Sequence, residues 1–244
     1  GYGCMRWPTV VKGGQDEIDQ DMVNELVDYA LAHGVNYFDT SPAYCKGRSE
    51  HATGIALSRY PRDKYFIATK LSNFSPDTWG REASIAMYHN SLKELQVDYL
   101  DYMLLHGIGM GGMEAMKGRY LDNGILDFLV SERAAGRIRN LGFSYHGDIE
   151  VFDYLLSRHD EIKWDFVQYS GHYYGTFIGR SAFECSQSYC FPSEAATSGG
   201  QCRFMGLPFC RITGTCAYGV ERYDLYGTFA GQFTHLLTIS SIGR

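Results

Sequence analysis

Two kinds of hydrophobic pattern alternate along the first 170 residues of the chain. Short apolar runs, typical of buried strands, alternate with longer segments in which an apolar residue recurs every three or four positions, as on one face of a helix. Strands that alternate with amphipathic helices predict a parallel sheet with right-handed crossovers. The predicted strands are 2–6, 35–39, 65–70, 99–106, 140–144 and 166–169, and the predicted helices are 19–33, 49–59, 80–95, 122–135 and 149–158.

The chain length fits one large domain. Its 244 residues are close to the length of an eight-stranded α/β barrel, for which about 250 residues are typical. We therefore predict the α/β class and a (β/α)8 barrel of the TIM type, with six recognisable strands. Gly34 is predicted to end the first helix and Ser49 to cap the second, with Glu50 suited to its positive start. Residues 107–117, rich in Gly and Met, are predicted to form a loop.

The pattern is lost from about Gly171 onward. Lys163 is the last lysine, and the sequence that follows is rich in Gly, Ser, Thr, Cys, Phe and Tyr without a helical stripe. We divide the chain into a barrel portion, 1–170, and an unassigned tail, 171–244. Three interpretations of the tail stay open: a divergent closure of the barrel, foreign or out-of-frame sequence after a truncated domain, or a cysteine-based module.

Five of the seven cysteines lie in this tail. The intervals Cys185-x4-Cys190, Cys202-x7-Cys210 and Cys210-x5-Cys216 differ from the two-residue spacing of zinc ribbons and bacterial ferredoxin clusters. We therefore predict neither a metal site nor an iron–sulfur cluster, and a disulfide framework is not favoured because nothing indicates secretion. The five residues are Cys185, Cys190, Cys202, Cys210 and Cys216.

The charge and hydropathy of the chain exclude some classes of partner. A formal net charge of -6 and a pI of about 5.7 argue against a nucleic-acid or anionic membrane surface. The sequence shows no apolar run long enough to span a bilayer and no secretory signal, so we expect a cytoplasmic protein. The first residue is Gly1 rather than Met, and we expect a fragment, a processed chain or one that lacks a short N-terminal hairpin.

Three of the predicted strands end in polar residues. Asp39, Lys70 and His106 follow successive apolar runs, and the carboxyl ends of parallel strands lie at the same edge of a sheet. Pro42 breaks the chain before Tyr44, which is therefore expected just beyond the first of these strand ends. We expect four polar groups to converge at this edge.

These residues resemble those of a known family, the aldo-keto reductases. The similarity lies in Asp39-Thr40 with Tyr44, in Ser49-Glu50 and the Gly54 to Leu57 segment, and in Lys70 and His106 at the next strand ends. Residues 1–6 and 142–147 are most similar to the branch that often carries a ferredoxin-like C-terminal domain. The resemblance covers about residues 1–170. It implies a nicotinamide-dependent oxidoreductase that reduces an aldehyde or ketone, with a small-molecule carbonyl compound as substrate.

The four residues also suit carbonyl reduction on chemical grounds. Hydride addition places negative charge on the carbonyl oxygen, so a proton donor must stand beside it. A tyrosine is a weak acid, with an ordinary pKa near 10, and a neighbouring ammonium lowers that pKa. We therefore expect Tyr44 to be the general acid, Lys70 to lower its pKa, Asp39 to anchor Lys70, and His106 to hydrogen-bond the substrate oxygen.

The resemblance also implies a cofactor site. Ser144 and Gln168 would bind the nicotinamide carboxamide, with Met5 and Asp39 near the ribose, and NADP(H) is favoured over NAD(H). Tyr145 departs from the family, which usually has Asn there, and this removes one expected carboxamide contact. The residues that grip the phosphates in the family follow strand six, and here that region is the tail.

Other functions stay open at this point. The chain could be an inactive or truncated relative that retains the four residues, or a binding or regulatory barrel without turnover. A metal-dependent hydrolase that uses Asp39 and His106 is disfavoured, because Lys70 and Tyr44 are poor metal ligands. A barrel without its last strands has open edges, so an oligomer is expected if the tail does not close the sheet.

Overall fold

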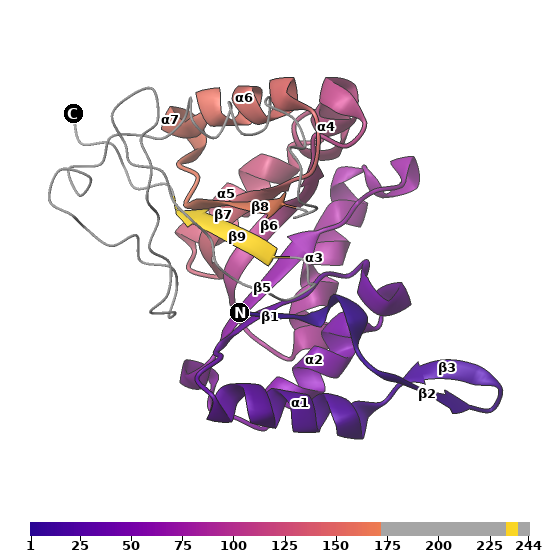
Figure 1. The fold of residues 1–244 in the computed structure, drawn as a ribbon. Helices are drawn as coiled ribbons and strands as arrows, with labels where there is room; N and C mark the ends of the chain where they lie inside the picture. Colours follow the sequence, from indigo (N-terminus) through magenta and orange to yellow (C-terminus); the bar gives the residue numbers. More distant parts are fainter. Residues whose placement is uncertain (172–232, 239–244) are drawn as a thin grey trace, which may run out of the picture.

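The computed structural model describes residues 1–171 and 233–238 (Figure 1). Strands and helices alternate as predicted, and six parallel strands form a sheet that curls into half of a barrel. Figure 1 shows the helices around the outside of this curved sheet. The strands are β1 (Tyr2–Gly3), β2 (Thr9–Lys12), β3 (Gln15–Ile18), β4 (Tyr37–Asp39), β5 (Phe66–Leu71), β6 (Leu100–Ile108), β7 (Ile138–Tyr145), β8 (Phe166–Gly171) and β9 (Phe233–Thr238). The α-helices are α1 (Gln20–Ala32), α2 (Ser49–Leu57), α3 (Arg81–Leu95), α4 (Gly112–Tyr120), α5 (Ile125–Ala134), α6 (Ile149–Ser157) and α7 (His159–Ile162).

The parallel strands follow one another in the order β1-β4-β5-β6-β7-β8. Each new strand lies beside the one before it, because a helix returns the chain along the outside of the sheet. The predicted α/β class and barrel-type sheet are confirmed for these six strands. All their carboxyl ends therefore lie at one edge, where the predicted polar residues stand.

The last described strand departs from this arrangement. Strand β9 pairs with β8 in the antiparallel sense, with Gln168 opposite Leu236, and Figure 1 shows it alongside β8. A regular (β/α)8 barrel consists of parallel strands, so β9 is not a regular seventh strand. Apart from Gly171 and β9, the tail lies outside the described ranges, and so do the three interpretations that concern it.

Side chains alternate between two faces of each strand, and this places the core and the site. The outward face packs against the helices in one large apolar core, which includes Phe38, Ile67, Met103, Phe143 and Val167. The inward face carries a smaller cluster inside the curve of the sheet, formed by Ala68, Tyr102, Leu104 and Phe166 with Tyr37. By the same alternation the polar residues at the carboxyl ends of these strands belong to the inward face.

Two predicted boundaries near the site were wrong. The predicted strand 2–6 ends at Gly3, because Cys4–Arg6 form a 3-10 turn that buries Cys4. The predicted loop 107–117 contains most of helix α4, whose residues Met116 and Tyr120 lie one helical turn apart and are both buried. Its many glycines concealed this short apolar stripe.

A hairpin that the sequence analysis missed projects from the body of the protein (Figure 1). Strands β2 and β3 pair antiparallel around Gly13 and Gly14, which have φ angles of 58° and 79°. Two consecutive residues with positive φ are what a tight hairpin turn requires, and glycine adopts them readily. The Gly-Gly pair was the available signal.

Ser49, which was predicted to cap helix α2, instead makes a buried contact with the start of the chain. Arg48, not Ser49, precedes the helix, and the Ser49 hydroxyl is buried, where it donates to the Cys4 carbonyl at 2.7 Å. Gly54 packs against α3 so tightly that an added Cβ would lie 2.3 Å from the Glu94 carbonyl oxygen. The residue at position 54 must therefore lack a side chain for the two helices to cross.

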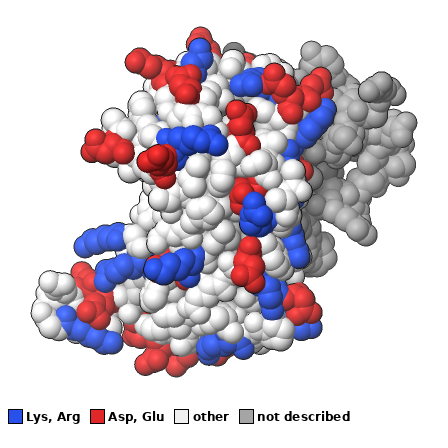
Figure 2. Space-filling model, turned by 180° about the vertical axis from the view of Figure 1, so that it is seen from behind, with Lys and Arg blue, Asp and Glu red and all other residues white. Residues whose placement is uncertain are grey.

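The surface carries charges of both signs. Figure 2 shows Lys and Arg side chains interspersed with Asp and Glu side chains over the face opposite that of Figure 1. Within the described ranges, no helix combines the length and the hydropathy that a bilayer crossing demands. In the same part of the chain, no group of three or more His, Cys, Asp and Glu side chains is arranged to hold a metal ion.

Candidate active site

The four residues predicted to converge do lie together at the carboxyl edge of the sheet. Asp39 ends β4, Lys70 lies one residue before the end of β5, and His106 lies in the last third of β6. Asp39 pairs in register with Ala68, so Lys70 extends two residues beyond it on the same inward face. Tyr44 follows in the turn after β4, where its backbone N–H donates to the Ser41 carbonyl at 3.0 Å.

Lys70 stands at the centre of this group. Its side chain is 3% exposed, and Nζ donates to Asp39 Oδ1 at 2.5 Å and to the Thr40 carbonyl at 2.8 Å. The same Nζ lies 4.9 Å from the centre of the Tyr44 ring. Burial acts to lower the pKa of Lys70, but the charge and hydrogen bond of Asp39, together with the contact with Tyr44, outweigh it and the pKa is raised. The side chain is therefore held as an ammonium.

Tyr44 differs from the expectation in the direction of its pKa. Burial raises the pKa above its ordinary value, Lys70 acts to lower it, and Asp39 acts to raise it, with a net increase. The neighbouring ammonium was expected to decide the direction, but the effect of burial on the pKa is larger. Tyr44 therefore keeps its hydroxyl proton at neutral pH. The turn that presents it continues through Cys45 and Lys46, whose φ angles of 50° and 57° are uncommon for residues other than glycine.

His106 faces Tyr44 edge to face, with 5.8 Å between the ring centres. Burial, with further contributions from Lys70, His146 and Arg119, lowers the pKa of His106 well below its ordinary value, so the imidazole is neutral. Its Nδ1 atom lies 2.6 Å from Ser72 Oγ. Among the described residues no hydrogen bond engages Nε2, which remains free for a ligand.

Of the predicted cofactor residues, Gln168 is the one that contacts the four. It lies on the inward face of β8, and its Nε2 donates to Asp39 Oδ2 at 3.1 Å. A carboxylate can only accept, so this bond fixes the orientation of the Gln168 amide. Its Oε1 atom is buried and has no hydrogen-bond partner among the described residues. The carboxylate of Asp39 thus connects Lys70 on one side with Gln168 on the other.

The other predicted cofactor residues lie nearby but are engaged differently. Ser144 pairs in register with Gln168, and its Oγ accepts from the Gly107 N–H at 3.0 Å. Met5 is 36% exposed, and its carbonyl oxygen accepts from the Cys45 thiol at 3.4 Å. Tyr145, which was expected to cost the site one carboxamide contact, belongs to the outward face, and its ring packs against Phe152.

Several polar and aromatic residues around His106 were missed by the sequence analysis. Ser41 and Ser72 lie against its ring, Phe74 packs 4.9 Å from it, and Arg119 donates from Nη2 to its backbone carbonyl at 2.6 Å. Ser72 could have been found, because it lies two positions after Lys70 and continues the inward alternation. Arg119 gave no signal, because it reaches the site from a helix predicted as a loop.

A cavity of about 470 Å³ opens beside this histidine. Phe74 and Arg119, which both contact His106, form part of its wall, and their own side chains stack with 4.8 Å between guanidinium and ring centre. The rest of the lining is mostly apolar. The lining residues are Phe74, Pro76, Trp79, Met110, Gly111, Ala115 and Arg119.

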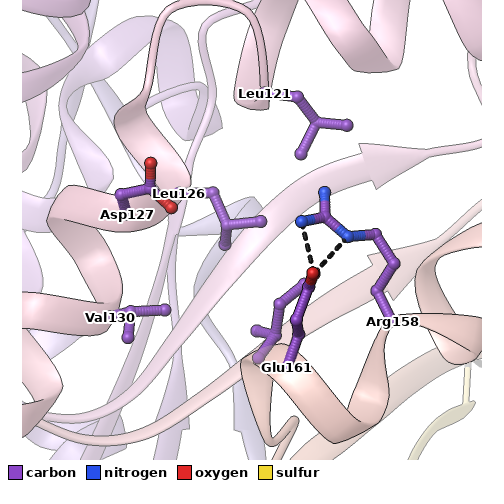
Figure 3. Close-up of a pocket in the computed structure, with 7 residues that line it drawn as sticks. Leu121, Leu126, Asp127, Val130, Arg158 and Glu161 are labelled. Carbon is purple, nitrogen blue, oxygen red and sulfur yellow. Dashed lines mark hydrogen bonds and ion pairs between the residues drawn. The ribbon is translucent and has the colours of Figure 1, made fainter.

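A second cavity, of about 310 Å³, lies away from these residues. It is lined from α5, α7 and the chain that leads into them, and Figure 3 shows Arg158 and Glu161 paired at one side of it, across from Leu121 and Leu126. None of the predicted site residues lines it. The carboxyl edge of the sheet therefore remains the candidate active site.

Comparisons with known proteins identify the family of the chain. The family model described as the aldo/keto reductase family matches residues 1–184, which confirms the predicted resemblance. D-arabinose 1-dehydrogenase of Saccharomyces cerevisiae is 35% identical over 99 residues, which are 38% of this chain and 29% of that protein. L-galactose dehydrogenase of Arabidopsis thaliana is 28% identical over 144 residues, which are 58% of this chain and 43% of that protein.

A solved structure of similar fold is an aldo-keto reductase from Bacillus halodurans, described as its holo form. It is 26% identical, with a TM-score of 0.50 over 64% of this chain and 49% of that one. The chain therefore spans about half, or less, of the length of the relatives that it matches.

Proposed function

Because the chain belongs to the aldo/keto reductase family, we propose that it is a nicotinamide-dependent oxidoreductase that interconverts a small carbonyl compound and its alcohol. One observation carries the proposal. Asp39, Lys70, Tyr44 and His106 meet at one sheet edge, with a charged pair inside the curve of the sheet and a neutral histidine beside it. Burying an ammonium is costly, and such clusters are frequent at functional sites.

Tyr44 is proposed to donate the proton to the carbonyl oxygen. Its raised pKa keeps the hydroxyl protonated at neutral pH, so the acid is ready for reduction. As the proton leaves, the developing phenolate is stabilised by the Lys70 ammonium. Asp39 holds that ammonium in place through its 2.5 Å contact. A bound nicotinamide cofactor would supply the hydride to the carbonyl carbon.

His106 is proposed to hold the carbonyl oxygen. It is neutral, and Nε2 is the ring nitrogen left free by the contacts of Nδ1. A hydrogen bond from Nε2 would orient the substrate toward Tyr44 and stabilise charge on the oxygen. Loss of one such donor typically lowers kcat by about 10²–10³.

The residues on β8 fit the carboxamide of a nicotinamide. Gln168 Oε1 is a buried acceptor without a partner in the described part of the chain, and a carboxamide NH2 is a donor that would satisfy it. Ser144, its register neighbour, is proposed to contribute a second contact, and Met5 and Asp39 to lie near the ribose. NADP(H) is the proposed form, with NAD(H) as the alternative to be titrated beside it.

A second candidate, a relative that has lost turnover, is favoured by two observations. The chain spans half or less of the length of its relatives. Strand β9 is antiparallel at the place where a regular barrel has a parallel seventh strand. In that case the four residues would be inherited without a complete cofactor site.

Turnover of the full chain separates the two candidates. The protein is incubated with NADPH, or with NADH, and a panel of small aldehydes and ketones, and oxidation of the nicotinamide is followed by absorbance. The proposal predicts carbonyl-dependent oxidation that saturates in both reactants. A folded chain that binds neither nucleotide and oxidises neither would favour the second candidate.

A further inference from the structure

A row of buried hydroxyl groups leads to the back of the His106 ring. The Ala43 backbone N–H donates to Ser41 Oγ at 3.1 Å, Ser41 Oγ lies 2.8 Å from Ser72 Oγ, and Ser72 Oγ lies 2.6 Å from His106 Nδ1. Ser41, Ser72 and the imidazole are all buried. The row starts at the turn that presents Tyr44 and ends on the nitrogen of His106 that faces away from a ligand.

The direction of the hydrogen bonds in this row follows from counting protons. The neutral imidazole carries one proton, on Nδ1 or on Nε2. If Ser41 donates to Ser72 and Ser72 donates to Nδ1, each hydroxyl donates once and accepts at most once, and the proton of the ring is on Nε2. Every buried hydroxyl hydrogen then has an acceptor.

The opposite direction leaves a hydroxyl hydrogen without a good acceptor. If Nδ1–H donates to Ser72 and Ser72 donates to Ser41, Ser41 Oγ accepts twice, because the Ala43 N–H already points to it. Its own hydrogen then has no other acceptor among the described residues, apart from a long 3.3 Å approach to a ring nitrogen that is already protonated. If Ser41 instead donates to Ser72, which also accepts from Nδ1–H, the Ser72 hydrogen is left with the Lys70 carbonyl at 3.5 Å, which is too long for a good hydrogen bond. Buried hydroxyl groups in proteins rarely stay unpaired, so the first direction is favoured.

We propose that Ser41 and Ser72 are positioning residues that fix His106 as its Nε2–H tautomer, so that the ring presents a donor to the substrate oxygen. The catalytic meaning of this tautomer rests on the proposed function, but the tautomer itself does not. The reverse tautomer would present a lone pair to a carbonyl oxygen and repel it. Arg119 supports the arrangement from the other side, since it holds the His106 backbone carbonyl.

The tautomer can be read directly by NMR. The full chain is labelled with ¹⁵N in its histidines, and the His106 ring nitrogens are assigned by their absence in the His106→Gln variant. The proposal predicts an unprotonated Nδ1 and a protonated Nε2 in the free protein, at neutral pH, without nucleotide. A protonated Nδ1 with an unprotonated Nε2 would overturn it.

Variants of the row test its cause. Ser72→Ala removes the donor to Nδ1 and is expected to give a mixed or reversed tautomer, with kcat lowered about tenfold or more and the KM for nucleotide unchanged, because loss of a direct donor costs about 10²–10³. Ser41→Ala leaves the Ser72 hydroxyl in place and is expected to act more weakly. Ser72→Thr retains the hydroxyl and should restore the Nε2–H tautomer.

The control is Ser58→Ala, which removes an exposed hydroxyl that bonds only its own helix. An unchanged tautomer in folded Ser72→Ala would refute the proposal, whatever its rate. A third outcome separates this proposal from the proposed function. If the wild type has the Nε2–H tautomer, Ser72→Ala changes it and the chain shows no turnover, the role of the two serines is supported and the proposed function is refuted.

Discussion

The carboxyl edge of the sheet has two halves, one formed by the ends of β4 to β6 and the other by the ends of β7 and β8. The halves differ in how far their polar side chains are paired with other residues. On the first half, the charged and neutral polar groups bind one another: Lys70 holds Asp39, and Ser72 holds His106. On the second half, Gln168 keeps a buried oxygen that has no partner among the described residues, and the strand that pairs with β8 on its far side is antiparallel.

This difference separates two kinds of site. The first half is preorganised by the protein's own residues, so its geometry is set before any ligand arrives. The second half has a binding atom that only a ligand, or chain outside the described residues, would satisfy. Asp39 connects the two halves, because it binds Lys70 in the first and Gln168 in the second. A substitution in one half is therefore expected to affect the other.

The largest effect is expected from removing the acid of the first half alone. Tyr44→Phe should lower kcat for carbonyl reduction by about 10²–10⁴, the usual contribution of a general acid, and leave the affinity for nucleotide nearly unchanged. The matched control is Tyr37→Phe, because the buried hydroxyl of Tyr37 has no hydrogen-bond partner in the described part of the chain. Steady-state kinetics of both variants measure the difference, and equal losses would show that Tyr44 has no special role.

The Lys70 contact should matter for stability as well as for rate. Lys70→Met leaves the Asp39 carboxylate, only 14% exposed, without its cation, and is expected to destabilise the fold by about 3 kcal/mol. Adding Asp39→Asn should restore much of this stability without restoring activity. Urea unfolding of the two variants, with the exposed Lys64→Met as control, checks the prediction. A Lys70→Met protein as stable as the control would contradict the account of a buried pair.

A buried acid behind the first half predicts a pH effect on stability. Burial raises the pKa of Glu50 from 4.5 to about 7, although it accepts a hydrogen bond from Thr69 at 2.5 Å. The folded state therefore binds this proton more tightly than the unfolded state. The stabilisation that this proton gives is fully present below pH 4.5 and is lost as the pH rises to about 7. The loss lowers the free energy of unfolding by up to about 3 kcal/mol.

Glu50→Gln should remove this loss. We expect the variant to be more stable than the wild type at about pH 8 and similar to it at about pH 5, as measured by urea unfolding. Glu82→Gln, which changes an exposed carboxylate, should leave the pH profile as it is. A wild-type profile that stays flat between these two pH values would show that Glu50 is ionised without penalty.

The smallest effect is expected in the second half. Gln168→Leu removes the buried Oε1 acceptor, which has no partner in the part of the chain that the structure describes, and the bond to Asp39. It should weaken nucleotide binding by about tenfold, the value of roughly one hydrogen bond with its desolvated partner. Isothermal titration with NADPH measures it. Because Asp39 also loses a donor, a modest fall in kcat is expected to accompany the weaker binding, whereas Tyr44→Phe should change kcat alone.

The sequence predicted the first half better than the second for a physical reason. Asp39, Lys70 and His106 each end an apolar run, and strand alternation with parallel order is sufficient to bring them together. The direction of the Tyr44 pKa could not be predicted in the same way. It depends on how deeply the side chain is buried, and the sequence indicates only which charged residues are near it. Ser49 was assigned to a cap because of its place before a helix, and only the tertiary fold shows it bonded to Cys4.

Other contacts depend on segments with weak sequence patterns. Arg119 reaches His106 from α4, whose glycines resemble those of a loop. The hairpin β2–β3 has few apolar residues, so its sequence lacks the alternation typical of strands despite its Gly-Gly turn. Gln168 was predicted from the family resemblance alone. Its position beside Asp39 depends on a hydrogen bond between residues that are 129 positions apart in the sequence.

The central claim is that the acid–base residues belong to a working site with a nicotinamide beside them. Titration of the full, folded chain with NADPH, and separately with NADH, tests this most directly through the quenching of its tryptophan fluorescence. The account predicts saturable binding of at least one nucleotide, with the same affinity in Tyr44→Phe and a lower affinity in Gln168→Leu. A folded wild-type chain that binds neither nucleotide would contradict it.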